Sequence, residues 1–178
     1  MKKVLIICGS PRPGGNSDLL ADQFAKGATE SGNTVEIIHL RNLKINYCLG
    51  CLGCLPDKMA CVQRDDANSL IPKLVAADVI VFSTPVYYYS VTAQMKTFLD
   101  RMNPLFGHLS NKELYYMVTA VDEDHTQLDR AMDALQGWAD CFDGMTTVGR
   151  IYGGGARDKG DIVKLPSYQQ AYDMGKKL

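Results

Sequence analysis

Residues 4–17 have the sequence VLIICGSPRPGGNS, in which an apolar run passes directly into a loop of small, polar and basic residues. The apolar run, residues 4–8, predicts a strand covered on both faces, because it does not alternate with polar residues. After the loop, Asn16 or Ser17 is expected to cap a helix. A second strand over residues 34–40 completes a βαβ unit, which predicts neighbouring parallel strands in a doubly wound sheet.

The same alternation continues along the rest of the chain. A helix is expected after Asp65 and Asp66, and Pro72 within it requires either a kink or a helix start at Ser69. Three more strands are expected over residues 79–82, 114–121 and 145–152, and three more helices over residues 92–102, 127–142 and 166–178. Five strands alternating with five helices predict a three-layer α/β domain that covers residues 1–178.

Composition excludes several classes of partner. The chain has 178 residues, of which 46% are hydrophobic, so it can bury a core of its own. Its net charge of −1 provides no long-range field for nucleic acid or anionic lipid. No apolar run approaches the roughly 18 residues that a membrane span needs, and the run before Gly9 is too short for a signal peptide. We therefore expect a cytoplasmic protein with no nucleic-acid or membrane partner, in which cysteines stay reduced.

The loop at residues 9–17 is a candidate anion site. Backbone N–H groups at a helix N-terminus, together with hydroxyls and the basic Arg12, suit a phosphate. A triphosphate-binding loop would need a lysine where Gly15 stands, and the dinucleotide pattern G-x-G-x-x-G is absent, so a monophosphate fits better. The alternative is a flexible connection between strand and helix, although nine residues is long for one.

A second unusual loop follows the third predicted strand. Residues 83–90 have the sequence STPVYYYS. Ligands of open α/β sheets bind outside the carboxyl ends of the strands, at the switch point between the first and third strands, where both loops are expected. Three consecutive tyrosines cannot all point into a core, so at least one should offer its ring or hydroxyl to this crevice. The alternative for any single tyrosine is that it covers the next helix.

Taken together, these motifs resemble the NAD(P)H-dependent FMN reductases of flavodoxin-like fold. The resemblance extends over residues 3–102 and rests on motifs in the family's order: GSPR at 9–12, GNS at 15–17, Cys-x2-Cys-x2-Cys from Cys48, STPVY at 83–87 and AQMK at 93–96. It implies a five-stranded parallel sheet of order 2-1-3-4-5 with FMN at the switch point, NAD(P)H as hydride donor, and a homodimer.

The resemblance also implies which residues bind FMN. It assigns the phosphate to the first loop, at Ser10, Arg12, Gly15, Asn16 and Ser17. It assigns the border of the isoalloxazine ring to the second loop, at Pro85, Val86, Tyr87, Tyr88, Tyr89 and Ser90. A third loop is expected to complete the pocket, either at Ala120 and Asp122 or at the glycine run that begins with Gly153.

Four closely spaced cysteines, Cys48, Cys51, Cys54 and Cys61, form a separate candidate site. Four thiolates are the usual ligand set of a 4Fe–4S cluster, and the spacing is similar to that of iron–sulfur flavoproteins, a branch of the same family. It departs from the bacterial ferredoxin run, since Val62 rather than proline follows the last cysteine. Free or reversibly paired thiols are the main alternative, and zinc, which usually takes two well-separated cysteine pairs, ranks lowest.

The leading hypothesis is an FMN-dependent oxidoreductase that takes hydride from NAD(P)H and reduces a small acceptor, such as free flavin or a quinone. No catalytic side chain is predicted, because the flavin itself carries the redox chemistry. The alternative is an electron-transfer flavoprotein in which FMN and an iron–sulfur cluster relay single electrons between protein partners. Small carriers of that type dock through a strongly acidic face, which a net charge of −1 does not indicate. A sensor or repair protein that works through its cysteines is a third reading.

Overall fold

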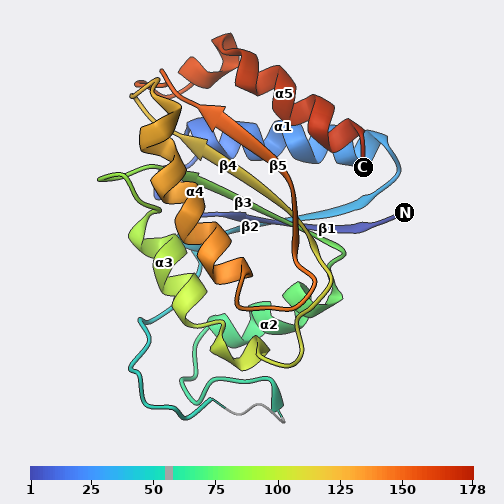
Figure 1. Ribbon diagram of the computed structural model, residues 1–178, viewed down its shortest axis with the longest axis vertical. Helices are drawn as coiled ribbons and strands as arrows, with labels where there is room; N and C mark the ends of the chain where they lie inside the picture. The colour runs from blue at the N-terminus through green and yellow to red at the C-terminus, as the bar shows by residue number, and fades with distance from the viewer. Residues whose placement is uncertain (55–57) are drawn as a thin grey trace.

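The computed structural model describes residues 1–54 and 58–178 and contains a five-stranded parallel sheet of order β2-β1-β3-β4-β5. Its strands are Lys3–Cys8 (β1), Thr34–His39 (β2), Val79–Pro85 (β3), Glu113–Thr119 (β4) and Thr146–Gly153 (β5). The predicted flavodoxin-like fold and strand order are therefore confirmed. Because all strands run the same way, their carboxyl ends meet at one edge of the sheet (Figure 1).

The apolar run that predicted β1 lies in the interior of the sheet. Ile6 pairs with Ile37 of β2 on one side and with Val81 of β3 on the other. Residues 4–8 are all buried, as expected for a strand covered on both faces.

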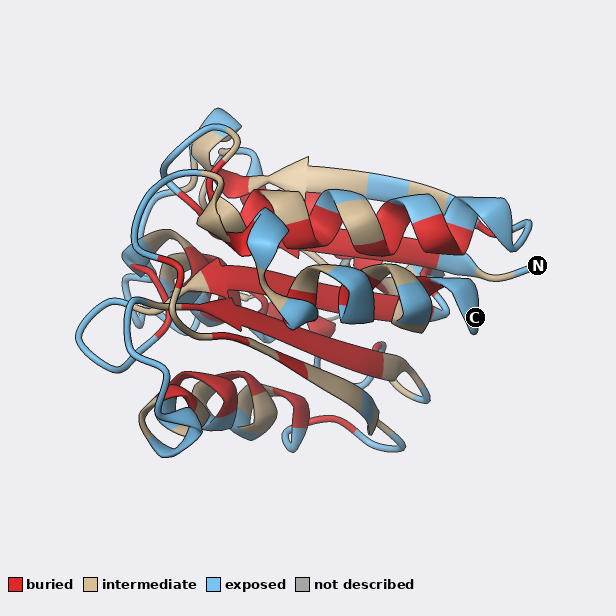
Figure 2. Cartoon of the chain, turned by 90° about the horizontal axis from the view of Figure 1, so that it is seen from above, coloured by how far each residue is buried: buried red, intermediate tan, exposed pale blue. Residues whose placement is uncertain are grey.

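Five helices cover the two faces of the sheet, and buried positions line the inner sides of both layers (Figures 1 and 2). One face is covered by Asn16–Glu30 (α1) and Pro166–Lys176 (α5). The other face is covered by Ala67–Ala76 (α2), Ala93–Asp100 (α3) and His125–Ala139 (α4). Each layer forms its own hydrophobic core with one set of alternate strand side chains.

Helices α1 and α5 contact each other backbone to backbone. A Cβ atom at Gly27 of α1 would collide with the backbone of Tyr172 and Lys176, and one at Gly175 of α5 would collide with the backbone of Phe24. Only glycine permits this approach. The contact fixes α5 beside α1, so that the loop entering α5 lies close to the loop entering α1 (Figure 1).

Several element boundaries differ from those predicted. The N-cap of α1 is Gly15, without a side-chain cap, rather than Asn16 or Ser17. Helix α2 starts at Ala67, so the start at Ser69 is wrong, and Pro72 is accommodated inside the helix. The other predicted ends agree with the structure to within three residues, and four of them, at Cys8, Thr34, Val79 and Pro166, agree to the residue. Within the described part of the chain, no helix combines the length and apolar character needed to cross a membrane.

Candidate functional site

Two adjoining cavities open at the carboxyl edge of the sheet. The first, of about 220 Å³, is lined by Ser10, Arg12, Gly15, Asn16, Ser17, Pro85, Val86, Tyr87, Thr119, Ala120, Val121, Ala156, Arg157 and Lys159. The second, of about 320 Å³, is lined by Val86, Tyr88, Tyr89, Ala120, Val121, Asp122, Gln127 and Leu128. Three residues are common to both linings, Val86, Ala120 and Val121, so the two cavities adjoin and are treated together as one site. It lies where the loops after β1, β3, β4 and β5 converge.

Most of the predicted site residues line these cavities, and two do not. Ser90 instead pairs with Tyr87 through two backbone hydrogen bonds of 3.0 and 3.1 Å. Gly153 lies at the end of β5, where its carbonyl accepts the N–H of Ala120 at 3.1 Å. The third loop of the site therefore combines the segment after β4 with residues beyond Gly153, which include the two cations Arg157 and Lys159.

The first loop, residues 9–17, is folded by its own hydrogen bonds. The Ser10 hydroxyl accepts from the N–H of Arg12 and donates to its carbonyl, both at 3.1 Å. The N–H of Gly15 donates to the same carbonyl at 3.1 Å. A Cβ at Gly15 would lie only 3.1 Å from the Ser10 hydroxyl oxygen, so the tight turn favours glycine there. These bonds give the loop a defined shape of its own.

A buried ion pair supports this loop from below. Asp18 of α1, whose side chain is 2% exposed, accepts from the Arg41 guanidinium at 2.8 Å and from the Gly14 N–H at 2.9 Å. Arg41 also donates to the carbonyl of Ser10 at 3.3 Å. His39 lies on the other side, with Nδ1 at 3.5 Å from the second carboxylate oxygen. Asp18 and Arg41 therefore tie the first loop to the end of β2.

The same cluster contains a potential ligand set that the structure does not favour as a metal centre. Ligand atoms of Cys8, Asp18 and His39 lie within 4.8 Å of one another. Burial, and then the negative charge of Asp18, raise the pKa of the Cys8 thiol, so the neutral thiol prevails rather than the thiolate that a metal needs. Arg41 already neutralises the Asp18 carboxylate.

The first cavity has the features of a phosphate site. It lies at the N-terminus of α1, where first-turn N–H groups have no acceptor within the helix and the helix dipole favours an anion. The Ser17 hydroxyl oxygen, on a residue only 1% exposed, has no hydrogen-bond partner. Arg12, Arg157 and Lys159 line the cavity, and no carboxylate is among the described residues that line it.

The Asn16 side chain joins the first loop to the last loop, residues 154–160. Nδ2 donates to the carbonyl of Asp158 at 2.9 Å, and Oδ1 accepts from the N–H of Gly160 at 2.9 Å. Sequence analysis did not single out the basic residues of the last loop, although two cations in a glycine-rich segment after a strand are a signal for an anion site.

The wall of the second cavity is a strained tyrosine turn, residues 87–90. Tyr88 and Tyr89 have φ angles of +50° and +61°, the left-handed region that tyrosine rarely adopts. Tyr88 is fully exposed, whereas the Tyr89 ring lies 5.2 Å from the Arg130 guanidinium in a cation–π contact. Strain of this kind is concentrated at ligand sites in proteins. The turn presents aromatic surface at the mouth of the site, as the tyrosine run predicted.

The cysteine loop, residues 48–61, lies apart from the described cavities. Its four cysteines are free; Cys48 and Cys51 are exposed, and Cys54 and Cys61 are partly exposed. Residues 55–57 lie outside the described residues. Within the described part of the chain, no three sulfur atoms of the loop lie within 4.8 Å of one another. A cluster ligated by these cysteines therefore stays a prediction.

The base of the cysteine loop is held by a buried ion pair that sequence analysis missed. Arg101, at the end of α3 and 1% exposed, forms a bidentate pair with Asp65 at 2.7 and 3.0 Å. It also donates to the carbonyl of Asn46 at 2.7 Å. Burial opposes its charge, but hydrogen bonds with Asp65 and Cys61 raise the pKa of Arg101. Asn68 of α2 meanwhile accepts from the backbone N–H of Cys61 at 2.8 Å.

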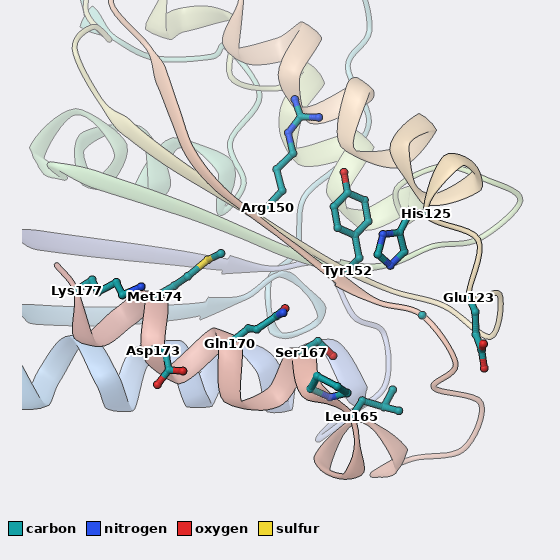
Figure 3. Close-up of a pocket in the computed structure, with 12 residues that line it drawn as sticks. Glu123, His125, Arg150, Tyr152, Leu165, Ser167, Gln170, Asp173, Met174 and Lys177 are labelled. Carbon is teal, nitrogen blue, oxygen red and sulfur yellow. The ribbon is translucent and has the colours of Figure 1, made fainter.

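A larger groove of about 750 Å³ runs along the edge strand β5, between α4 and α5 (Figure 3). His125 and Tyr152 stack there with ring centroids 4.5 Å apart. Burial, and then a 2.5 Å hydrogen bond to Asp129, raise the pKa of Tyr152. The charged groups of the lining are mixed in sign and spread along the groove, and none of the predicted site residues lines it. It does not have the convergent polar groups of the first cavity.

Comparison with known proteins matches most of the chain to one described family. A model of the family described as NADPH-dependent FMN reductase matches residues 2–156. An iron–sulfur flavoprotein of Archaeoglobus fulgidus is 48% identical over 106 residues, which cover 60% of this chain and 47% of that protein. An iron–sulfur flavoprotein of Methanocaldococcus jannaschii is 39% identical over 103 residues, or 58% and 53% of the two chains. The chain thus spans about half the length of these curated relatives.

One solved structure illustrates the shared fold. It is an NAD(P)H:quinone oxidoreductase from Methanothermobacter marburgensis, with a TM-score of 0.79 and 16% identity, and the match covers 99% of this chain and 95% of that one. At this level of identity the likeness concerns the fold alone.

Proposed function

The chain belongs to the NADPH-dependent FMN reductase family, and we propose that it is an oxidoreductase that binds FMN, takes hydride from NAD(P)H and reduces a small acceptor. One observation carries this proposal: the first cavity joins a helix N-terminus, the unpartnered Ser17 hydroxyl and three cations, and no carboxylate is among its described lining residues. Such a cavity suits a phosphate monoester dianion. FMN differs from riboflavin by that group.

The residues present fit the rest of FMN as well. The second cavity is lined mainly by apolar and aromatic side chains, among them Val86, Tyr88 and Tyr89, and it joins the first cavity directly. Arg12 and Ser17 would hold the phosphate, Ser10 would keep the loop folded around it, and the tyrosine turn would border the isoalloxazine ring. When bound, FMN supplies hydride acceptance from the nicotinamide and electron delivery to the acceptor. The chain's own contribution is to position the flavin and to exclude water from one of its faces.

The second candidate function is electron transfer between proteins through FMN and an iron–sulfur cluster. Two observations favour it. Relatives named iron–sulfur flavoprotein match more than half of this chain, and the four cysteines lie on one loop. Four further points stay predictions: the identity of the small electron acceptor, the homodimer, the cytoplasmic location and the single-domain organisation.

Anaerobic reduction of the FMN-loaded protein distinguishes the two functions. Rapid mixing with NADPH or NADH should bleach the oxidised flavin absorbance within a stopped-flow measurement. Dithionite provides the control that the bound flavin is reducible. If dithionite bleaches the flavin and neither nucleotide does, the electron-transfer function replaces the reductase function.

A further inference from the structure

We propose that Arg157 and Lys159 of the last loop bind the phosphate monoester together with Arg12, and that Asn16 positions them instead of binding phosphate itself. The inference rests on the proposed function, because it assigns residues to the same FMN site. It extends that site from the family's first loop to a segment more than 140 residues away in the sequence.

The charges of the first cavity indicate a dianion. Arg12, Arg157 and Lys159 all line it, and within the described residues none of the three lies within ion-pair distance of a carboxylate. All three are exposed at the rim of a volume of about 220 Å³, where an anion that enters can be reached by three cations that no described carboxylate occupies. A phosphate monoester provides both the charge and the acceptor oxygens for such a site.

Lys159 reaches the first loop directly. Its Nζ and Cε atoms both lie 3.3 Å from the position that a Cβ at Gly14 would occupy. Gly14 has a φ of +64°, so the end of the lysine side chain lies against a left-handed turn of the first loop. The ammonium group therefore lies over the same loop that carries Ser10 and Ser17.

The side chain of Asn16 forms hydrogen bonds with backbone groups that flank Arg157 and Lys159 in the sequence. Besides its bonds at 2.9 Å to Asp158 and Gly160, Nδ2 donates to the carbonyl of Ala156 at 3.4 Å, and Oδ1 accepts from the N–H of Ile162 at 3.4 Å. Both amide hydrogens and both carbonyl lone pairs have partners between residues 156 and 162. No donor of this side chain is left for a phosphate, so Asn16 acts as a positioning residue.

Two ligands of the proposed reaction carry a phosphate monoester: FMN, and NADPH at its 2′ position. We assign the cations to FMN, because they share the cavity with Ser17 and with the N-terminus of α1. The experiment below separates the two sources.

Titration of apoprotein by quenching of flavin fluorescence tests the assignment. Arg157→Ala and Lys159→Ala should each raise the Kd for FMN roughly ten- to a hundredfold, and should leave the Kd for riboflavin within about twofold. Lys96→Ala is the matched control, because Lys96 is exposed on α3, lines neither cavity, and its loss changes net charge equally. An unchanged Kd for FMN combined with a raised KM for NADPH, but not for NADH, would overturn the assignment in favour of the nucleotide.

A double-mutant cycle tests the role of Asn16. Asn16→Ala should weaken FMN binding in the wild-type background, but should add little to the loss already caused by Arg157→Ala with Lys159→Ala. Additive losses would show that Asn16 binds phosphate itself. If wild-type protein does not bind FMN, or binds riboflavin equally well, the proposed function fails. If wild-type protein prefers FMN and both cation variants retain that preference, only this inference fails.

Discussion

The first loop and the cysteine loop are both motif-rich connections, yet the fold treats them differently. The first loop is bonded along its length, by Ser10 within it, by Asp18 below it and by Asn16 to the last loop. The cysteine loop is held mainly at its base, by Arg101 and by Asn68, and two of its four cysteines are exposed.

The difference shows that a sequence motif forms a binding site where its groups converge on one volume. In the first loop the backbone, a buried hydroxyl and the surrounding charges converge on one volume, so the protein alone specifies what binds there. In the cysteine loop the Arg101 ion pair and the Asn68 hydrogen bond hold the base, and among the described residues no three of its sulfur atoms lie within 4.8 Å of one another. The predictions below test whether the two regions are independent in this way.

Removal of Arg101 should have the largest effect on stability. Arg101→Leu leaves the buried Asp65 unpaired, so the free energy of unfolding in urea should fall by about 3–5 kcal/mol. FMN affinity should not change, because the ion pair supports only the cysteine loop. Asp65→Asn combined with Arg101→Leu should recover part of the loss. A fall below about 1 kcal/mol would mean that the pair does not anchor the loop.

The same pair predicts a pH dependence. Burial alone would raise the pKa of Asp65, but hydrogen bonds from Arg101 and from two backbone N–H groups lower it overall. A carboxyl whose folded pKa is lowered stabilises the protein above its unfolded pKa of about 3.9, and this stabilisation is lost as pH falls through the folded value. The free energy of unfolding should therefore fall less on acidification in Asp65→Asn than in wild type, as measured by urea unfolding at a series of pH values.

Removal of Arg41 should affect both stability and binding, in contrast to Arg101. Arg41→Met leaves the buried Asp18 without its cation, at a cost of about 3 kcal/mol in the free energy of unfolding. Because Arg41 also holds the carbonyl of Ser10, FMN should bind more weakly as well. Unfolding in urea and flavin titration on the same preparation measure the two effects. Normal FMN affinity in this variant would show that the ion pair does not shape the loop.

The exposed cysteines of the cysteine loop should react with thiol reagents faster than the buried cysteine of the sheet. In protein free of iron, Cys48 and Cys51 should react with a thiol reagent at least roughly a hundredfold faster than Cys8, whose burial raises its pKa. Mass spectrometry after timed quenching assigns each site. Reconstitution with iron and sulfide provides the second arm, since a cluster of about four irons and four sulfides would protect all four loop cysteines. Equal reactivity of Cys8 would contradict the buried core position.

The smallest expected effect concerns the tyrosine turn. Tyr88→Asn should raise the free energy of unfolding by about 0.5–1 kcal/mol, because asparagine tolerates the left-handed conformation better and the exposed ring makes no core contact. Tyr47→Asn is the matched control, since Tyr47 is also exposed but does not have a positive φ. A gain in the control as large as that in the variant would remove strain as the cause.

The sequence predicted the fold well because its signals are local. Unbroken apolar runs and helical periodicity predicted the alternating strands and helices, and the resemblance to the FMN reductases supplied the strand order that the structure confirms. The loops at the strand ends bring Ser10, Arg12 and the tyrosines to one edge of the sheet. Contacts between distant segments could not be predicted, because no pattern reveals that residues 156–162 bond the Asn16 amide or that the buried Arg101 pairs with Asp65, 36 positions away.

The central claim is that the first cavity binds a phosphate monoester, and the most direct test compares FMN with riboflavin. Apoprotein should bind FMN at least about a hundredfold more tightly than riboflavin in isothermal titration, since charge-assisted hydrogen bonds act only on the phosphate. Arg12→Ala combined with Ser17→Ala should remove most of that difference by weakening FMN alone. Equal affinities in the wild-type protein, or equal weakening of both ligands in the variant, would contradict a phosphate site at this loop.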